Sequence, residues 1–254
     1  GSNNIAIGNN ANQNAESGSS NIHIGYRVHH GITGNKDVGD NNVTIGHLAG
    51  QYSSGSANNK NVTIGYIAGR DNNGFENVFI GNESAKLKQN GDNNTFLGSD
   101  TGDGYVEYDT TTLIGKAAEA NATGESNQTV IGASAIGKGS NTVTIGDDNV
   151  TDIYMAEDSG AKVHASAIDI NQDANAVAIS VDTELTTAIG LNIEADVITT
   201  GNVARFYSDS STTNTRNLVE ITNDNTSAAG ATPLRIRQDA PHSAIDIDLS
   251  LIHI

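Results

Sequence analysis

The residues of this chain that could do chemistry are mainly carboxylates, and they lie in segments rich in asparagine, glycine and serine. The densest group runs from Asp100 to Asp109. Clustered oxygen ligands in a loop suit Ca²⁺, but this loop lacks the spacing of an EF-hand. We therefore interpret it, and the pair Asp147-Asp148, as exposed turns with solvated carboxylates. No metal site is predicted there.

Histidines and tyrosines near glycine-rich segments are the other candidates, as contacts and not as catalysts. Aromatic rings in such segments can stack on sugars, or they can cap the ends of packed elements. His23, in a short apolar run, could bind a metal ion on a symmetry axis, but we expect it to face outward. The predicted receptor contacts are His29, His30, Tyr52, Tyr105 and Tyr108. Other aromatic residues in similar places are Tyr26, Tyr66 and Phe75.

Signatures of catalysis are missing from the sequence. It contains no nucleophile elbow, no phosphate loop with its lysine and no His-Glu-x-x-His motif. Paired carboxylates for glycan cleavage have no flanking aromatic platform. We therefore predict no catalytic residue, no cofactor and no enzymatic role.

Composition narrows the classes of partner. The chain has 254 residues, of which 36% are hydrophobic and 4% aromatic, which is little apolar material for a single compact core. Its formal charge of −17 disfavours nucleic acid and anionic membranes. No apolar run approaches the roughly 20 residues of a membrane-spanning helix, so no membrane insertion is expected.

A repeated word dominates the first 146 residues, and its copies stand 14 to 21 residues apart. Each copy is a short β-branched run followed by glycine, as in Asn61-Val-Thr-Ile-Gly65. A fixed word at a loose period predicts stacked coils, here an all-β solenoid. The repeat glycines are Gly8, Gly25, Gly46, Gly65, Gly81, Gly98, Gly115, Gly132 and Gly146.

The positions within the word predict how each strand is used. Ile or Leu always precedes the glycine, and Ile, Val or Thr stands three residues before it. The residue between them varies, so one side of the strand is expected to be buried and the other free. Asn stands four residues before the glycine in six copies and is expected to form a ladder between coils. The glycine is expected either to adopt a backbone angle that a Cβ forbids or to let a neighbouring segment of backbone approach closely.

Four regions follow from the pattern. The repeat region covers residues 1–149, with inserted loops at 27–40, 51–60, 85–93 and 100–110. A junction covers residues 150–162. Residues 163–248 carry a different alternating word, for example Ile168-Asp-Ile170, and are expected to form a fibrous β-shaft. Residues 249–254 match the translation of a common sequencing adapter and are interpreted as an artefact.

The residues of the first region, best at Thr129–Gly146, Thr44–Gly50 and Thr63–Gly69, resemble the head repeats of trimeric YadA-like adhesins. The stretches 214–224 and 233–239 are similar to phage tail-fibre shafts. These resemblances imply a left-handed β-roll followed by an intertwined triple-stranded β-helix in a parallel homotrimer. They also imply a virion or other extracellular location.

The resemblance implies a structural and receptor-binding segment of a trimeric phage tail fibre that attaches to a glycan or protein of the host surface. Avidity from three copies would supply the binding strength. Two alternatives stay open at this point. One is a bacterial trimeric surface adhesin, and the other is a tailspike that acts as a polysaccharide lyase or hydrolase.

Overall fold

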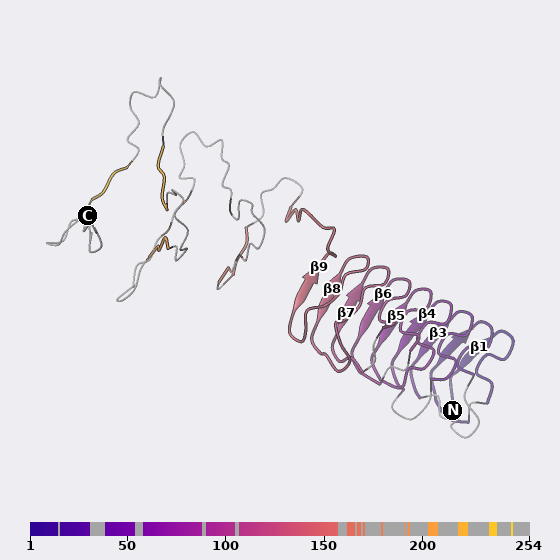
Figure 1. Ribbon diagram of the computed structural model, residues 1–254. Coiled ribbons are helices and arrows are strands. Elements are labelled where there is room, and N and C mark those ends of the chain that lie inside the picture. Colours follow the sequence, from indigo (N-terminus) through magenta and orange to yellow (C-terminus); the bar gives the residue numbers. More distant parts are fainter. Residues whose placement is uncertain are drawn as a thin grey trace. The chain divides into compact units, whose positions relative to one another are not determined.

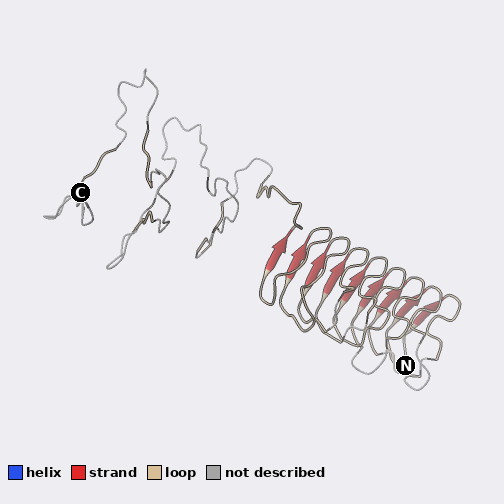
Figure 2. Cartoon of the chain, in the orientation of Figure 1, coloured by secondary structure: helices blue, strands red, loops and turns tan. Residues whose placement is uncertain are grey.

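The structure is a computed structural model that describes residues 1–14, 16–30, 39–53, 58–87, 90–104 and 107–156, with short pieces of the remainder. The chain divides into two units, 1–163 and 164–254. The described part of the first unit is a parallel β-solenoid without helices (Figures 1 and 2). Its strands are β1 (Ile5–Ile7), β2 (Ile22–Ile24), β3 (Val43–Ile45), β4 (Val62–Ile64), β5 (Val78–Ile80), β6 (Thr95–Leu97), β7 (Thr112–Ile114), β8 (Thr129–Ile131) and β9 (Val143–Ile145).

All nine strands coincide with the nine predicted words, and they form one sheet in sequence order. Neighbouring strands pair in parallel and in register, so that Val43 lies opposite Val62 and Ile45 opposite Ile64. Each coil therefore contributes one strand and stacks on the previous coil. The prediction of a repeat-based β-solenoid is confirmed.

The side of each strand that faces the interior is not the one expected for His23. The middle residue of the word points into the coil and is buried in every strand from β2 to β8. The two constant apolar residues that flank it face outward and are half-buried or exposed. The prediction that His23 faces outward is wrong, because a single coil closes around the variable position.

The repeat glycines hold the coils at their stacking distance. All nine have φ between 86° and 150°, a region that side chains with a Cβ rarely adopt. In the first seven, an added Cβ would overlap the carbonyl oxygen of the repeat glycine in the next coil. The close approach expected of this position is confirmed.

Asparagine side chains form a ladder along the solenoid, which is buried from Asn21 to Asn94. The Oδ1 of Asn42 accepts the backbone N–H of Asn61 at 2.9 Å, and the Oδ1 of Asn61 accepts that of Asn77 at 2.9 Å. Each Nδ2 donates to a backbone carbonyl, for example from Asn61 to Gly74 at 2.9 Å. One amide thus satisfies two backbone groups inside the stack, and the expected ladder is confirmed. Its members are Asn4, Asn21, Asn42, Asn61, Asn77 and Asn94.

The interior of the solenoid changes character along its length. From β5 to β8 the middle position holds Phe79, Phe96, Leu113 and Val130, which pack with small alanines in one buried cluster. The rings of Phe79 and Phe96 have centroids 5.1 Å apart. From β2 to β4 the same position is polar, with His23, Thr44 and Thr63. The apolar half of the stack therefore supplies most of the hydrophobic stabilisation within one chain.

The second unit is described only in short pieces, and no strand is assigned among them. Most of the predicted shaft, 163–248, and all of 249–254 lie outside the described residues. Within the described pieces, apolar residues of the second word are largely exposed, as with Leu191 at 68% and Phe206 at 65%.

Replacing Gly65 by alanine is expected to lower the free energy of unfolding by more than about 3 kcal/mol. A strained φ alone costs about 1–3 kcal/mol, and the new Cβ also overlaps the Gly81 carbonyl. Gly139→Ala is the matched control, because Gly139 has φ +117 but open space around its Cβ position. Denaturant unfolding at equal chain concentration measures the free energy of unfolding of both variants. An equal decrease in both would contradict the role assigned to the close approach of Gly65 and Gly81.

Replacing Asn61 by alanine is expected to cost about 3 kcal/mol or more, since each buried polar group left unpaired costs about 1–3 kcal/mol. The variant leaves the Asn77 N–H and the Gly74 carbonyl without their amide partner. Asn121→Ala, on an exposed turn, is expected to stay within about 0.5 kcal/mol of the parent chain. Thermal melts followed by circular dichroism test the difference.

Candidate functional site

The outward face of the nine-stranded sheet is the first candidate surface. It is built from the two constant positions of the word, and fifteen of its eighteen residues are Ile, Val or Leu. Exposure is highest in the two terminal strands, at 57% for Ile7 and 68% for Val143, whereas the outward residues of β2 to β5 and of β7 are half-buried. Nine strands spaced about 4.8 Å apart make this apolar face continuous over all coils. We call it the outer apolar face.

A row of stacked aromatic residues flanks this face, immediately after the repeat glycines. The rings of Tyr26 and His47 stack with centroids 5.1 Å apart, and those of His47 and Tyr66 at 5.3 Å. Both tyrosines are nearly half exposed. His47 was not among the predicted contacts. Its place after Gly46, in register with Tyr26 and Tyr66, is the sequence signal that identifies it.

The predicted receptor contacts separate into two groups. Tyr52 is exposed at 39%, and His30 is half-buried with its Nε2 2.9 Å from the Gln13 Oε1. His29 and Tyr108 are buried inside the coils, so neither can touch a receptor in this conformation and the prediction is wrong for both. Tyr105 lies outside the described residues. Only Tyr52 and His30 are therefore placed where a partner can reach them.

Tyr108 serves the interior instead. Its hydroxyl donates to the Glu119 carboxylate, and its ring meets Phe96 edge-on with centroids 5.7 Å apart. Burial raises the pKa of Glu119, although the bonds from Tyr108 and from the backbone of Gly104 and Ala120 oppose this. Tyr108 is therefore a buried packing residue, and its hydroxyl is bonded to the half-buried Glu119.

His23 and His29 form a stacked pair within the polar half of the interior. Their ring centroids are 4.8 Å apart and their planes differ by 10°. Burial lowers the pKa of His23 to about 4 and that of His29 to about 3, with the His23 charge as a further cause for His29. Asn58 Nδ2 lies 3.3 Å from His29 Nε2. Both rings are therefore neutral at physiological pH.

The acidic loop does not gather its carboxylates. Asp103 forms an ion pair with Lys86 at 2.6 Å, and Asp109 accepts the Asp92 N–H at 2.8 Å. Lys86 also pairs with Glu83, and these two bonds raise its pKa. Among the described residues, no three His, Asp or Glu side chains converge as metal ligands.

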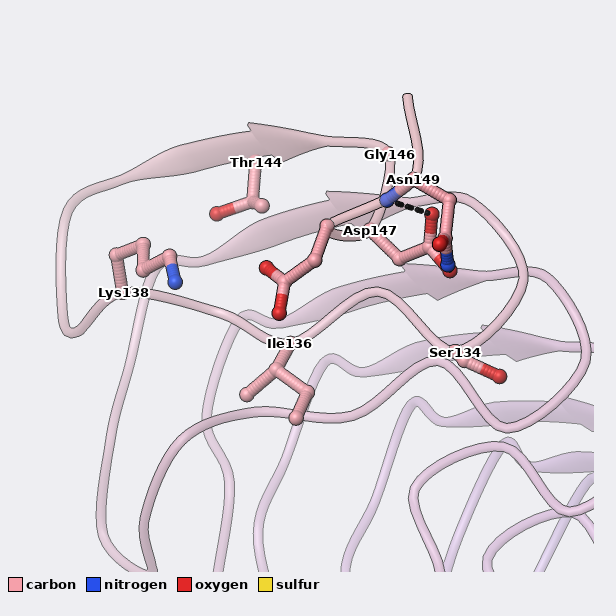
Figure 3. A pocket seen from close by; sticks show the side chains of 8 residues that line it. Ser134, Ile136, Lys138, Thr144, Gly146, Asp147 and Asn149 are labelled. Atoms are coloured by element: carbon pink, nitrogen blue, oxygen red, sulfur yellow. Dashed lines mark hydrogen bonds between the residues drawn. The ribbon is translucent and has the colours of Figure 1, made fainter. Parts of the chain in front are cut away.

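The end of the solenoid at β9 carries a hollow of about 380 Å³ (Figure 3). Asp147 there accepts the Asn149 side chain at 2.9 Å and its backbone N–H at 3.1 Å, and the side-chain bond is the main reason that its pKa is lowered. Thr144, Lys138 and Ile136 form the opposite rim (Figure 3). Asp147 is thus half-buried and its carboxylate is bonded within its own turn, whereas the sequence predicted a solvated carboxylate; Asp148 is exposed, as predicted.

Comparisons with family models, curated proteins and solved structures gave no match to this chain. The described part of the chain contains no helix long and apolar enough to cross a membrane. The class defined by the geometry is therefore a repeat-built parallel β-solenoid with an outer apolar face.

The buried histidines predict loss of stability in acid. Because the folded chain holds both rings neutral, the unfolded chain takes up more protons below its ordinary pKa of about 6.5. The contribution of His23 and His29 to the free energy of unfolding is fully present above about pH 6.5. It is lost as the pH drops toward the folded pKa values of about 4 and 3.

His23→Phe is expected to remove about half of the histidine part of that slope, since phenylalanine already fills this register position in β5 and β6. His47→Phe, on the exposed row, is the control. Denaturant midpoints measured from pH 7.5 to 4 give the slopes, and an unchanged slope in the His23 variant would contradict the assignment.

Proposed function

We propose that this chain is a structural and receptor-binding segment of a parallel homotrimeric fibre, of the phage tail-fibre kind, that attaches to a host cell surface. The observation that supports it is the outer apolar face. Contiguous apolar surfaces that a single chain leaves partly uncovered mark sites of association. Three copies with their outer apolar faces turned to a common axis would cover every constant position of the word.

The described pieces of the second unit support the same reading. Their apolar residues are exposed in one chain, among them Ile168, Val219 and Leu234. Strand words with two apolar residues each give one chain little to bury, whereas an intertwined triple-stranded shaft gives three chains a shared core. In this proposal the solenoid is a left-handed β-roll of the YadA-like head type, and it has no catalytic role.

The fibre mechanism follows from stiffness and multiplicity. Backbone bonds join successive coils on more than one side, for example Ile67 N to His47 O at 2.9 Å and Lys60 N to Asp40 O at 2.9 Å. Loops carried on such a scaffold keep their positions, so three weak contacts act together with high effective concentration. At the surface of a virion, this arrangement would present Tyr52 and His30 to a host glycan or protein.

Light scattering of the full chain is expected to give three times its 26.3 kDa mass. Ile64→Asp places a charge in the outer apolar face and is expected to shift the mass to that of a monomer, while the coil interior is untouched. Thr123→Asp adds the same charge on an exposed turn and is expected to leave the trimer intact.

A monomeric or dimeric parent chain would contradict the proposed trimer. Attachment is tested separately by binding of the labelled chain to candidate host cells. The Ile64→Asp variant is expected to lose most of its binding through lost avidity, and equal binding by monomer and trimer would count against the mechanism.

A further inference from the structure

A small hollow lies on the corner of the coils that precedes β3, β4 and β5. Its volume is about 300 Å³, at the small end of the range for ligand pockets. Successive pairs from three coils line it, and we call it the corner hollow. These residues are Asp40, Asn41, Asn59, Lys60, Phe75 and Glu76.

The corner hollow interrupts a second side-chain ladder, which runs through the residue six positions before the repeat glycine. Six residues at this position accept, through a side-chain oxygen, the backbone N–H of the same position in the preceding coil; Ser126 is not among them. Asp40 Oδ1 accepts from Ser19 at 2.6 Å, and Asn59 Oδ1 accepts from Asp40 at 2.6 Å. The same bond is made by Ser19, Asp92, Asp109 and Ser140.

Phe75 occupies this position but has no oxygen, so the side-chain ladder stops at it. Its ring is 39% exposed and lies outside the buried core cluster. A half-exposed phenyl ring therefore adds little to coil stacking at a place where an oxygen would add a bond. Coil stacking therefore does not explain why phenylalanine stands at this position.

The chemistry around the ring fits a sugar. A pyranose has an apolar C–H face, which stacks on an aromatic ring, and a rim of hydroxyls, which donate to carboxylate and amide oxygens. Asp40 and the amides of Asn41 and Asn59 supply such groups beside Phe75. The bond from Ser19 to Asp40 fixes that carboxylate before a ligand arrives, which lowers the entropy lost on binding.

Charge selects among sugars. Lys60 pairs with Glu76 at 2.7 Å, and these two charges cancel. The charge of Asp40 remains, so the corner hollow has a net negative charge in a chain of charge −17. Sialic and uronic acids are therefore repelled. We propose that the corner hollow binds one neutral sugar unit of a surface glycan, with Phe75 beneath its C–H face. This inference rests on the proposed function, since it names the chemistry of the attached surface.

Saturation-transfer NMR on the full chain tests the site, with the methyl glycosides of glucose, galactose and N-acetylglucosamine as probes and glucuronic acid as the anionic comparison. At least one neutral probe is expected to bind the parent chain, and glucuronic acid more weakly. Phe75→Tyr is expected to keep binding. Phe75→Ser is expected to weaken it about tenfold or more, through lost ring stacking.

Phe75→Ser is also its own control for folding, because serine already makes the corner bond at Ser19 and Ser140. Its melting temperature is expected to equal or exceed that of the parent. Binding of no neutral probe, equal binding by the serine variant, or a preference for glucuronic acid would each overturn the inference. If the mass is trimeric and cell attachment persists in such a case, the proposed function survives and the glycan site alone fails.

Discussion

The spacing between stacked coils is the constraint on which the rest of this structure depends. Parallel strands lie about 4.8 Å apart, so every residue has the equivalent residue of the next coil as its nearest neighbour. Side chains at each position must therefore tolerate, or use, copies of themselves. Glycine meets this requirement by having no Cβ, as Gly65 does against Gly81. Asparagine meets it because its amide both accepts and donates, as Asn61 does between Asn42 and Asn77.

The same constraint divides the strand into an inner and an outer side with different tasks. The inner position has to fill a narrow coil, and several solutions work, from stacked phenylalanines to stacked histidines. The outer positions stay Ile, Val, Leu or Thr because they form one continuous face and not nine separate ones. The least variable residues are therefore the ones that a single chain leaves partly uncovered.

The sequence predicted all nine strands because the word recurs and ends in glycine, and it predicted the asparagine ladder because the position is repeated. It did not predict which side was inside, since alternation with period two is the same for both sides of a strand. His29 and Tyr108 were assigned to loops from their neighbours, yet both fill coil interiors. The backbone conformation of the corners was also not predicted, because residues as different as Lys60 and Ile67 adopt positive φ there. Asn is the commonest non-glycine residue with positive φ in the described part of the chain, but many other side-chain types adopt the same angle.

In-register stacking also has an evolutionary consequence. Strands β3 and β4 carry the same word, Val-Thr-Ile-Gly, and lie opposite each other residue for residue. Deleting residues 43–61 would join Asn42 to Val62 and restore an intact word. Duplicating the same segment would add one coil in the same way. A gene built like this can lengthen or shorten its product by recombination in steps of about 4.8 Å, while each corner remains free to acquire a different loop.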